Sequence, residues 1–316
     1  MLRYAVRRLL YTPLVFLGVT ALVFVLLRLA PGDAARIRLA DLGLDPSPEA
    51  LAEMREELGL DRSLPEQYLR WLGDVCSLDF GNSLATGKPV AGEYFSHLKA
   101  TAALAFPALL LAAAIALPAG VFSAMKRGGP FDGACRVTAI FALSIPSFCL
   151  GLFLILLFSV RLRWLPSFGS GNMEHLVLPV LTAALGPAAH YTRFIRGTLL
   201  EEFSKDYIRA ARARGLSPAA LVWGQALKNA AAPVITSLGM SLAMLLGGQA
   251  VVEKVFSWPG AGKYLIDAIL RRDYPVVQCA VILFAVFFVS LNLLADMLCM
   301  LIDPQTRRLS AGKPGA

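Results

Sequence analysis

Long apolar runs alternate with shorter polar segments along the chain, and six of these runs approach the length of a bilayer crossing. They are Leu9–Leu27, Ala100–Met125, Val137–Val160, Leu176–Thr192, Ala230–Val252 and Val276–Ile302. A transmembrane helix needs about 20 apolar residues and satisfies its own backbone hydrogen bonds in lipid. The fourth run is short and carries Pro179, Pro187 and His190, so it fits this pattern least well. The pattern predicts an all-α, polytopic membrane protein with six transmembrane helices.

The longest polar segment, 33–98, carries the signals of short helices. Ser47 and Pro48 supply a capping hydroxyl and a proline at the first helical position. Apolar residues then recur at helical spacing until Gly59 ends the pattern. A second short helix is predicted over about 65–75. The segment is therefore expected to have helical structure of its own.

Another polar segment, 207–233, is basic and helical in pattern, and it lies between the fourth and fifth apolar runs. Gly215 ends its first helix, because glycine favours the position after a helix. Ser217 and Pro218 then begin the next helix as the capping residue and the first helical residue. The sequence predicts two short helices that meet at a sharp turn.

The first of these helices has the features of a docking surface. Helical spacing places Tyr207, Ala211 and Arg214 on one side, and the neighbouring alanines are small enough for another backbone to approach closely. We expect a partner protein to dock here. The alternative is a solvated basic loop that rests on anionic lipid.

Composition and charge agree with a membrane protein and indicate its orientation. The chain of 316 residues is 57% hydrophobic and 16% charged, against about 25% charged in soluble domains. Lysines and arginines gather at the N-terminus, around 126–136, over 193–228 and near the C-terminus, which places these parts in the cytosol. The net charge of +8 is thus explained by topology, and nucleic-acid binding is excluded. The expected organisation is an N-terminal transmembrane helix in 1–32, an extracytoplasmic helical segment in 33–98, a five-helix core in 99–302 with a cytosolic loop at about 193–229, and a cytosolic tail in 303–316.

No residue pattern predicts catalysis, a metal site or a cofactor. Gly260–Lys263 looks like part of a phosphate-binding loop, but Ser257 stands where that motif needs glycine, and Tyr264 stands where it needs Ser or Thr. We therefore expect no ATP site on this chain. The histidines lack metal-ligand spacing, and a loose outer contact through His97 and His175 is the alternative. His190 is expected to pack between helices, and the five cysteines form no disulfide framework.

A few polar or small residues inside the apolar runs are candidates for the transport pathway. Asp296 lies one helical turn from Asn292 in the last run, where it is either a pathway residue or a clamp between helices. Gly239, Gly247 and Gly248 in the fifth run permit close helix packing. Of these, the adjacent pair Gly247 and Gly248 is the better candidate for a gate. Arg28 is expected to reach the outer interface or to pair with Asp33.

The basic stretch resembles the EAA loop of ABC-importer permeases. Ala211, Gly215 and Pro233 match the core of that motif, while Arg209 stands in place of its leading acid, as is usual in the branch that imports dipeptides, oligopeptides and nickel. Further segments resemble the same branch in the same order: Leu26–Asp33, Leu58–Asp61, Gln67–Trp71, Leu78–Gly81, Phe256–Gly262 and Arg272–Val276.

The resemblance implies a type I importer permease in the inner membrane of a bacterium, with both termini in the cytosol. It implies four kinds of partner: a second homologous permease, two ATPases that bind the ATP, an extracytoplasmic solute-binding protein, and the lipid bilayer. The coupling helices, which dock the ATPase, would contain Tyr207, Ala211, Arg212, Arg214 and Gly215.

The substrate expected from the resemblance is nickel, imported as a chelate. Leu78–Val90 and Arg272–Cys279 look closest to nickel-import permeases, and dipeptides or oligopeptides are the alternative. A different class of transport protein, a self-contained channel or secondary carrier, would need charges in the membrane that couple to ions. Asp296 is the only candidate for such a charge in the apolar runs. A membrane enzyme would need catalytic residues that the sequence does not supply.

Overall fold

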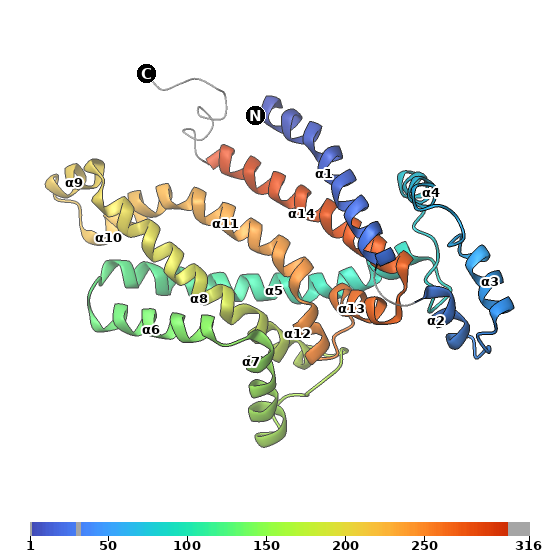
Figure 1. Ribbon diagram of the computed structural model, residues 1–316. Coiled ribbons are helices and arrows are strands. Elements are labelled where there is room, and N and C mark those ends of the chain that lie inside the picture. The colour runs from blue at the N-terminus through green and yellow to red at the C-terminus, as the bar shows by residue number, and fades with distance from the viewer. Residues whose placement is uncertain (1, 30–32, 303–316) are drawn as a thin grey trace.

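A computed structural model describes residues 2–29 and 33–302, and this part of the chain is nearly all helical (Figure 1). In the N-terminal third the helices are α1 (Leu2–Leu29), α2 (Ala34–Asp41), α3 (Pro48–Glu57), α4 (Leu64–Cys76) and α5 (Val90–Met125). The middle third contains α6 (Pro130–Ser144), α7 (Ser147–Leu154), the π-helix η1 (Ile155–Arg161), α8 (Glu174–Ser204) and α9 (Asp206–Ala213). The last third contains α10 (Pro218–Leu221), the π-helix η2 (Val222–Ala226), α11 (Leu227–Gly248), α12 (Ala250–Val255), α13 (Ala261–Arg271) and α14 (Tyr274–Ile302).

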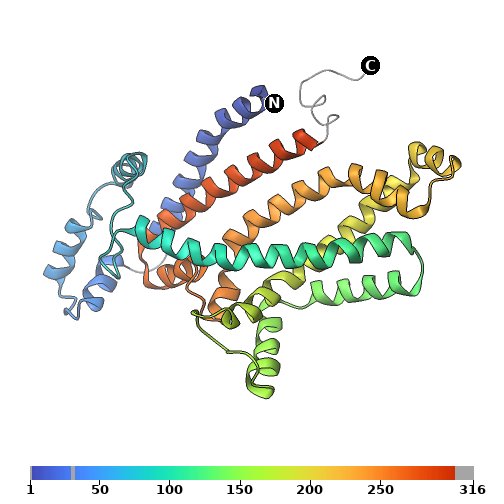
Figure 2. The same ribbon diagram turned by 180° about the vertical axis from the view of Figure 1, so that it is seen from behind.

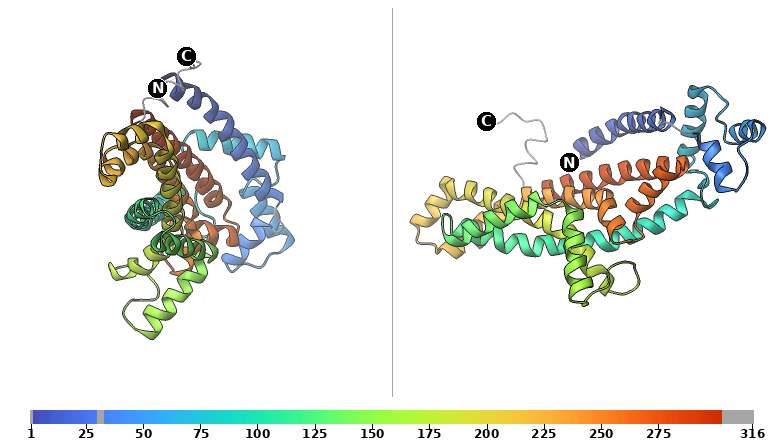
Figure 3. Two further views of the ribbon diagram at one scale, coloured as in Figure 1. Left: turned by 90° about the vertical axis from the view of Figure 1, so that its left-hand side faces the viewer. Right: turned by 60° about the horizontal axis from the view of Figure 1, so that its bottom comes forward.

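The long helices form an elongated bundle whose two ends carry different short helices. Helix α5 packs along α8, α11 packs along α14, and α1 lies against α14 (Figures 1 and 2). Helices α9 and α10 lie at one end of the bundle, and α2, α3 and α4 lie at the other (Figure 3). The predicted cytosolic segment and the predicted outer segment are therefore separated by the whole length of the bundle.

Apolar segments in lipid form helices because a helix satisfies its own backbone hydrogen bonds. Not every predicted span, however, is a long apolar helix. By length and composition, Val90–Met125, Pro218–Gly247 and Tyr274–Ala295 could cross a membrane. Helix α1 contributes a shorter apolar stretch, Phe16–Leu29, and α8 does not meet the same criterion. The all-α fold is thus confirmed, whereas the count of six spans is confirmed only in part.

The third predicted span, Val137–Val160, is not one continuous helix. Helices α6 and α7 meet at an angle of 98°, so the two together make a broken span or a re-entrant loop. Ile145 at the break has extended backbone angles, φ −87° and ψ 122°. The residue before a proline is disfavoured in the helical region, and Pro146 follows Ile145. The span predicted over Val137–Val160 is therefore not a single helix, and this proline explains the break.

The two helices predicted in the outer segment are confirmed as α3 and α4. The Ser47 hydroxyl accepts a hydrogen bond from Ala50 N at 3.2 Å, as expected of a capping serine. At the start of α4, the side chains of Ser63 and Glu66 form a reciprocal capping box. These helices are specified by local signals, which is why the sequence alone located them.

A buried carboxylate, that of Asp273, ties the predicted outer segment to the helical core. It accepts hydrogen bonds from the Ser83 hydroxyl at 2.6 Å, from Leu84 N at 3.0 Å and from Ala85 N at 3.2 Å. Asp273 is only 2% exposed and stands directly before α14. Two segments that are far apart in the sequence are thereby joined at the end of the bundle opposite α9 and α10.

Candidate coupling site and translocation groove

Helices α9 and α10 form the hinged pair that the sequence predicted. Helix α9 ends at Ala213, and Gly215 follows with φ +84°, in the left-handed region that favours glycine. Gly215 N donates to Arg212 O at 2.9 Å, which closes the turn. The Ser217 hydroxyl then accepts from Ala220 N at 3.3 Å and caps α10. The turn is therefore fixed by backbone geometry at both of its ends.

One side of this hinged pair packs on the rest of the chain and the other side is exposed. Ile208, Ala211 and Leu221 are at most 3% exposed, and Ile208 belongs to a core cluster shared with α8 and η2. The side chains of Arg209 and Arg212 are exposed. The hinged pair is thus anchored by its buried apolar side chains, while its arginines face solvent.

Glu202, at the end of α8, anchors the start of α9. Its carboxylate accepts hydrogen bonds from Lys205 Nζ at 2.5 Å and from the Tyr207 hydroxyl. The bond to Glu202 raises the pKa of Lys205, so the ammonium stays charged. Burial and the bond to Glu202 raise the pKa of the Tyr207 phenol, so the hydroxyl stays a donor. Glu202 is 6% exposed, which makes this a largely buried joint between α8 and α9.

A second buried carboxylate, Asp132, joins α5, α6 and α8 near the same end of the bundle. Arg196 donates to it twice, from Nε at 2.6 Å and from Nη2 at 2.9 Å. The Ser123 hydroxyl donates at 2.6 Å and Gly128 N at 2.9 Å. The bidentate geometry fixes both position and orientation of Arg196 on α8. The ends of α5, α6 and α8 near the hinged helices are therefore held together by ionic as well as apolar contacts.

The structure separates the five predicted docking residues into two groups. Arg212, Arg214 and Gly215 are exposed at the turn and available to a partner. Ala211 has no exposed surface, and Tyr207 is half-buried on Glu202, so both support the helix from within the chain. Docking of a partner at this surface stays a prediction.

An open groove of about 610 Å³ runs beside α8 in the same half of the bundle. Its lining residues come from α6, α8 and α11: Leu143, His190, Arg193, Phe194, Gly197, Thr198, Glu201, Glu202 and Pro233. His190 and Arg193 are exposed, and the His190 ring stacks on Phe194 with centroids 6.3 Å apart. His190 was expected to pack between helices, but it lies on the groove instead. This groove was not predicted from the sequence, because its walls come from three separate segments.

The predicted gate residues fall in the seam between α11 and α14. A Cβ atom at Gly247 would lie 1.6 Å from Phe284 Cε2, so the absence of a side chain lets the two helices meet. This contact favours the close-packing interpretation of Gly247. Gly248 ends α11, and its immediate surroundings lie outside the described contacts. Asp296 lies in α14 with its side chain also outside the described part, so its role stays a prediction.

The loop that resembled a phosphate-binding site is filled by the chain itself. Gly260 caps α13, and a Cβ atom there would lie 2.1 Å from Glu253 Oε1. Glu253 Oε2 accepts from Lys263 N at 2.8 Å, and Oε1 accepts from the Thr101 hydroxyl at 2.6 Å. A helix N-terminus attracts an anion, and here the anion is this buried carboxylate. The turn interpretation of Gly260–Lys263 is therefore the one that fits the geometry.

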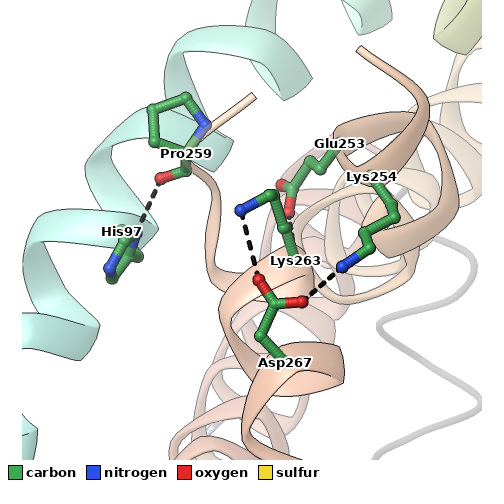
Figure 4. Close-up of polar contacts among 6 residues, drawn as sticks. All are labelled: His97, Glu253, Lys254, Pro259, Lys263 and Asp267. Atoms are coloured by element: carbon green, nitrogen blue, oxygen red, sulfur yellow. Dashed lines mark hydrogen bonds and ion pairs between the residues drawn. The ribbon is translucent and has the colours of Figure 1, made fainter. Parts of the chain in front are cut away.

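Further polar contacts surround Glu253 at this junction (Figure 4). Asp267 on α13 receives ion pairs from Lys254 and, at 3.1 Å, from Lys263. His97 Nδ1 donates to Pro259 O at 2.8 Å, and its ring stacks on Tyr264. Residues 253–267 are thereby fastened to α5.

The histidines do not gather into a metal site in the part of the chain that the structure describes. No group of three or more His, Cys, Asp or Glu side chains there has the arrangement to hold a metal ion. The suggested outer contact through His97 and His175 is not formed as a cluster. His175 instead lies beside Gly169, whose Cβ would be 3.6 Å from its ring.

Comparison with known proteins places this architecture in a family. A family model described as "Binding-protein-dependent transport system inner membrane component" matches residues 116–308, and its N-terminal counterpart matches residues 1–108. The chain is 38% identical over 308 residues to the "Glutathione transport system permease protein GsiC" of Shigella flexneri serotype 5b, covering 97% of this chain and 99% of that protein. It is 39% identical over 335 residues to the "Di/tripeptide transport system permease protein DppB" of Pseudomonas aeruginosa, with the same coverage of 97% and 99%.

A solved structure agrees at the level of the fold. The inward-facing MetNI methionine ABC transporter has a chain that matches 68% of this one and 99% of its own length, with a TM-score of 0.58 and 21% sequence identity. The matched region of this chain thus has the fold of a known transporter chain. The chain belongs to the inner-membrane components of binding-protein-dependent transport systems, and it is a permease subunit of an ABC importer.

Proposed function

We propose that this permease imports short peptides, of the size of di- and tripeptides, including glutathione. The observation that carries the proposal is the similarity, over 97% of the chain, to permeases named for glutathione and for di- and tripeptides. The nickel preference predicted from the outer segments is not supported by these relatives. The peptide alternative is therefore the better interpretation.

The groove beside α8 has chemistry that suits a short peptide. Arg193 and His190 offer donors to a carboxylate, and Glu201 offers an acceptor to an ammonium group. All three side chains are exposed or half-exposed on the groove side of α8. We infer that a second permease subunit closes the groove from its open side and completes the pathway.

The hinged helices supply the energy coupling in this proposal. An ATPase subunit docks on the exposed turn at Arg212, Arg214 and Gly215, and ATP is bound by that partner. Its movement is passed to α8 through the Glu202 joint and to α5 and α6 through Asp132 and Arg196. An extracytoplasmic binding protein delivers the peptide at the opposite end of the bundle.

The substrate is tested by uptake into cells that express the whole transporter with its binding protein. Radiolabelled glutathione, dialanine and nickel are offered separately, with and without a permease deletion. We expect permease-dependent uptake of at least one of the peptides and none of nickel. Permease-dependent uptake of nickel without peptide uptake would overturn the proposal.

The coupling role is tested at Gly215. Valine there is forced into the left-handed region, which costs about 1–2 kcal/mol for an L-residue, whereas asparagine tolerates that region. The space around Gly215 is open, so any effect comes from the backbone rather than from a clash. We expect Gly215→Val to reduce uptake at least about tenfold while ATP hydrolysis continues, and Gly215→Asn to retain most uptake. Equal uptake by the two variants would contradict the coupling role.

A further inference from the structure

A cavity at the outer end of the molecule, far from the hinged helices, is built for a charged ligand. It has a volume of about 250 Å³ and lies between α1, the α3–α4 region and the start of α14. Besides aromatic side chains, its lining carries three arginines and three acids: Arg28, Arg62, Arg70, Glu56, Glu57 and Asp74. Neither the coupling site nor the groove beside α8 shares a residue with it.

Two side chains that line this cavity have buried polar atoms without partners among the described residues. In Arg28 these are Nε and Nη1, and in Gln67 the atom is Oε1. The orientation of the Gln67 amide is fixed, because its Nε2 donates to Leu60 O at 3.3 Å and to Arg62 O at 2.8 Å. Buried polar atoms are nearly always hydrogen-bonded, and leaving them without a partner costs free energy. A ligand that pairs with both groups would remove that cost.

The unpaired atoms define the chemistry of the ligand. Arg28 offers donors in the fork geometry that suits a phosphate or carboxylate. Gln67 Oε1 offers an acceptor, and the cavity carries charges of both signs, the acids Glu57 and Asp74 and the further arginines Arg62 and Arg70. A ligand that pairs with both the Arg28 donors and the Gln67 acceptor carries an anionic group and an ammonium group a short distance apart.

The position of the cavity favours a lipid over a soluble zwitterion. Arg28 directly follows the uncharged run that ends at Leu27, so it lies where α1 leaves the hydrocarbon. Its guanidinium stacks over Phe24 at 5.1 Å and over Tyr274 at 4.9 Å, and Trp71 stacks on Phe24 at 5.9 Å. Such aromatic residues are typical of the membrane interface. Figures 1 and 3 also show α1 on the side of α14 away from α5, which is the outside of the bundle.

We propose that this cavity binds the headgroup of an aminophospholipid, phosphatidylethanolamine, from the outer leaflet. The phosphate accepts from Arg28 Nε and Nη1, and the ammonium donates to Gln67 Oε1. The carboxylates of Glu57 and Asp74 balance the ammonium charge. The bound lipid would contact α1, the α3–α4 region and the start of α14, and it would thereby hold these three parts together. The proposal does not depend on which substrate the permease imports.

The test is native mass spectrometry of the complete transporter after delipidation in detergent. Dioleoyl phosphatidylethanolamine, dioleoyl phosphatidylglycerol and dialanine are titrated separately. We expect the ethanolamine lipid to bind at least about tenfold more tightly than the glycerol lipid, because only the former carries an ammonium group. This comparison uses the unaltered protein, so it does not depend on the folding of a variant.

Variants then assign the binding to this cavity. Arg28→Gln and Gln67→Leu are each expected to weaken binding of the ethanolamine lipid at least about tenfold. Arg36→Gln is the control, since Arg36 is an exposed arginine of α2 outside the cavity, and it should change nothing. Equal binding by the Arg28 variant and the parent, or equal binding of the two lipids, would overturn the proposal. Displacement of the lipid by dialanine would also overturn it, because the site would then belong to the transported peptide.

Discussion

Buried carboxylates connect distant parts of this permease at both ends of the bundle. Asp132 binds Arg196, which lies 64 residues further along the chain, and Asp273 binds backbone and hydroxyl groups near Ser83, 190 residues away. Glu253 binds Thr101 across 152 residues. Each carboxylate is at most 2% exposed, and each accepts at least two hydrogen bonds. Individual residues of this kind determine how the helices are held relative to one another.

Loss of Arg196 is expected to be costly, because it leaves the Asp132 charge buried without its cation. Breaking a buried pair from one side costs about 3–5 kcal/mol. We expect Arg196→Met to lower the free energy of unfolding by that order, measured by unfolding in mixed detergent micelles. The matched control is Arg209→Met, which breaks the exposed pair with Asp206 and should cost less than about 1 kcal/mol. Similar losses in the two variants would show that the Asp132 pair is not a structural anchor.

None of these carboxylates was identified from the sequence, and the reason is physical. Their partners lie too far along the chain for spacing to reveal, and a carboxylate in a polar segment is normally solvated. Asp273 sits inside a segment that resembles the family, Arg272–Val276, yet the resemblance does not say what it contacts. The docking residues were easier to place, because Gly215 and Ser217 carry local backbone signals.

At the scale of elements, local signals predicted helix ends well and interruptions poorly. The starts of α3 and α10 were predicted from Ser47 and Ser217, and both serines cap their helices. The break between α6 and α7 was not predicted, because the uncharged run around Pro146 is long enough to cross a membrane as one helix. The break after Gly248 was also missed, since Gln249 is an uncharged residue in an apolar run.

The seam between α11 and α14 depends on close approach at glycine. We expect Gly247→Ala to destabilise the permease by about 1–3 kcal/mol, because its Cβ would overlap the Phe284 ring. Truncation of the ring by Phe284→Ala should relieve the overlap, so the double variant is less destabilised than the sum of the single variants. Unfolding of the three variants in mixed micelles measures this coupling. Additive losses would mean that Gly247 and Phe284 do not meet.

At the scale of the molecule, the two ends of the bundle were assigned to opposite sides of the membrane from charge alone. The structure places α9 and α10 at one end and the outer segment at the other, which agrees with that separation (Figure 3). The all-α fold and the hinged pair were thus predictable. The groove beside α8 and the cavity at Arg28 were not, because each is lined by three or more segments.

The attachment of the outer segment to the core is expected to depend on Asp273. Asp273→Ala removes the acceptor for Ser83, Leu84 and Ala85 and also the residue that precedes α14. We expect amide exchange at 83–85 and at the start of α14 to speed up at least about tenfold, measured by hydrogen–deuterium exchange. The control is Asp79→Ala, whose carboxylate accepts from the nearby Gly81 N at 2.9 Å, and it should leave the start of α14 unchanged. Unaltered exchange in the Asp273 variant would show that the outer segment is held elsewhere.

Helix α5 is much longer than a bilayer crossing requires. Its 36 residues span about 54 Å at 1.5 Å per residue, against a hydrocarbon core of about 30 Å. Thr101, about a third of the way along α5, is bonded to Glu253, and Ser123 near the C-terminal end is bonded to Asp132. If α5 moves as one rigid rod about a point between these two contacts, its two tips swing in opposite directions during ATP turnover. Spin-label distances from each tip to α14 are therefore expected to change with opposite sign between the nucleotide-free and ATP-bound transporter, and changes confined to one tip would mean that the rod bends.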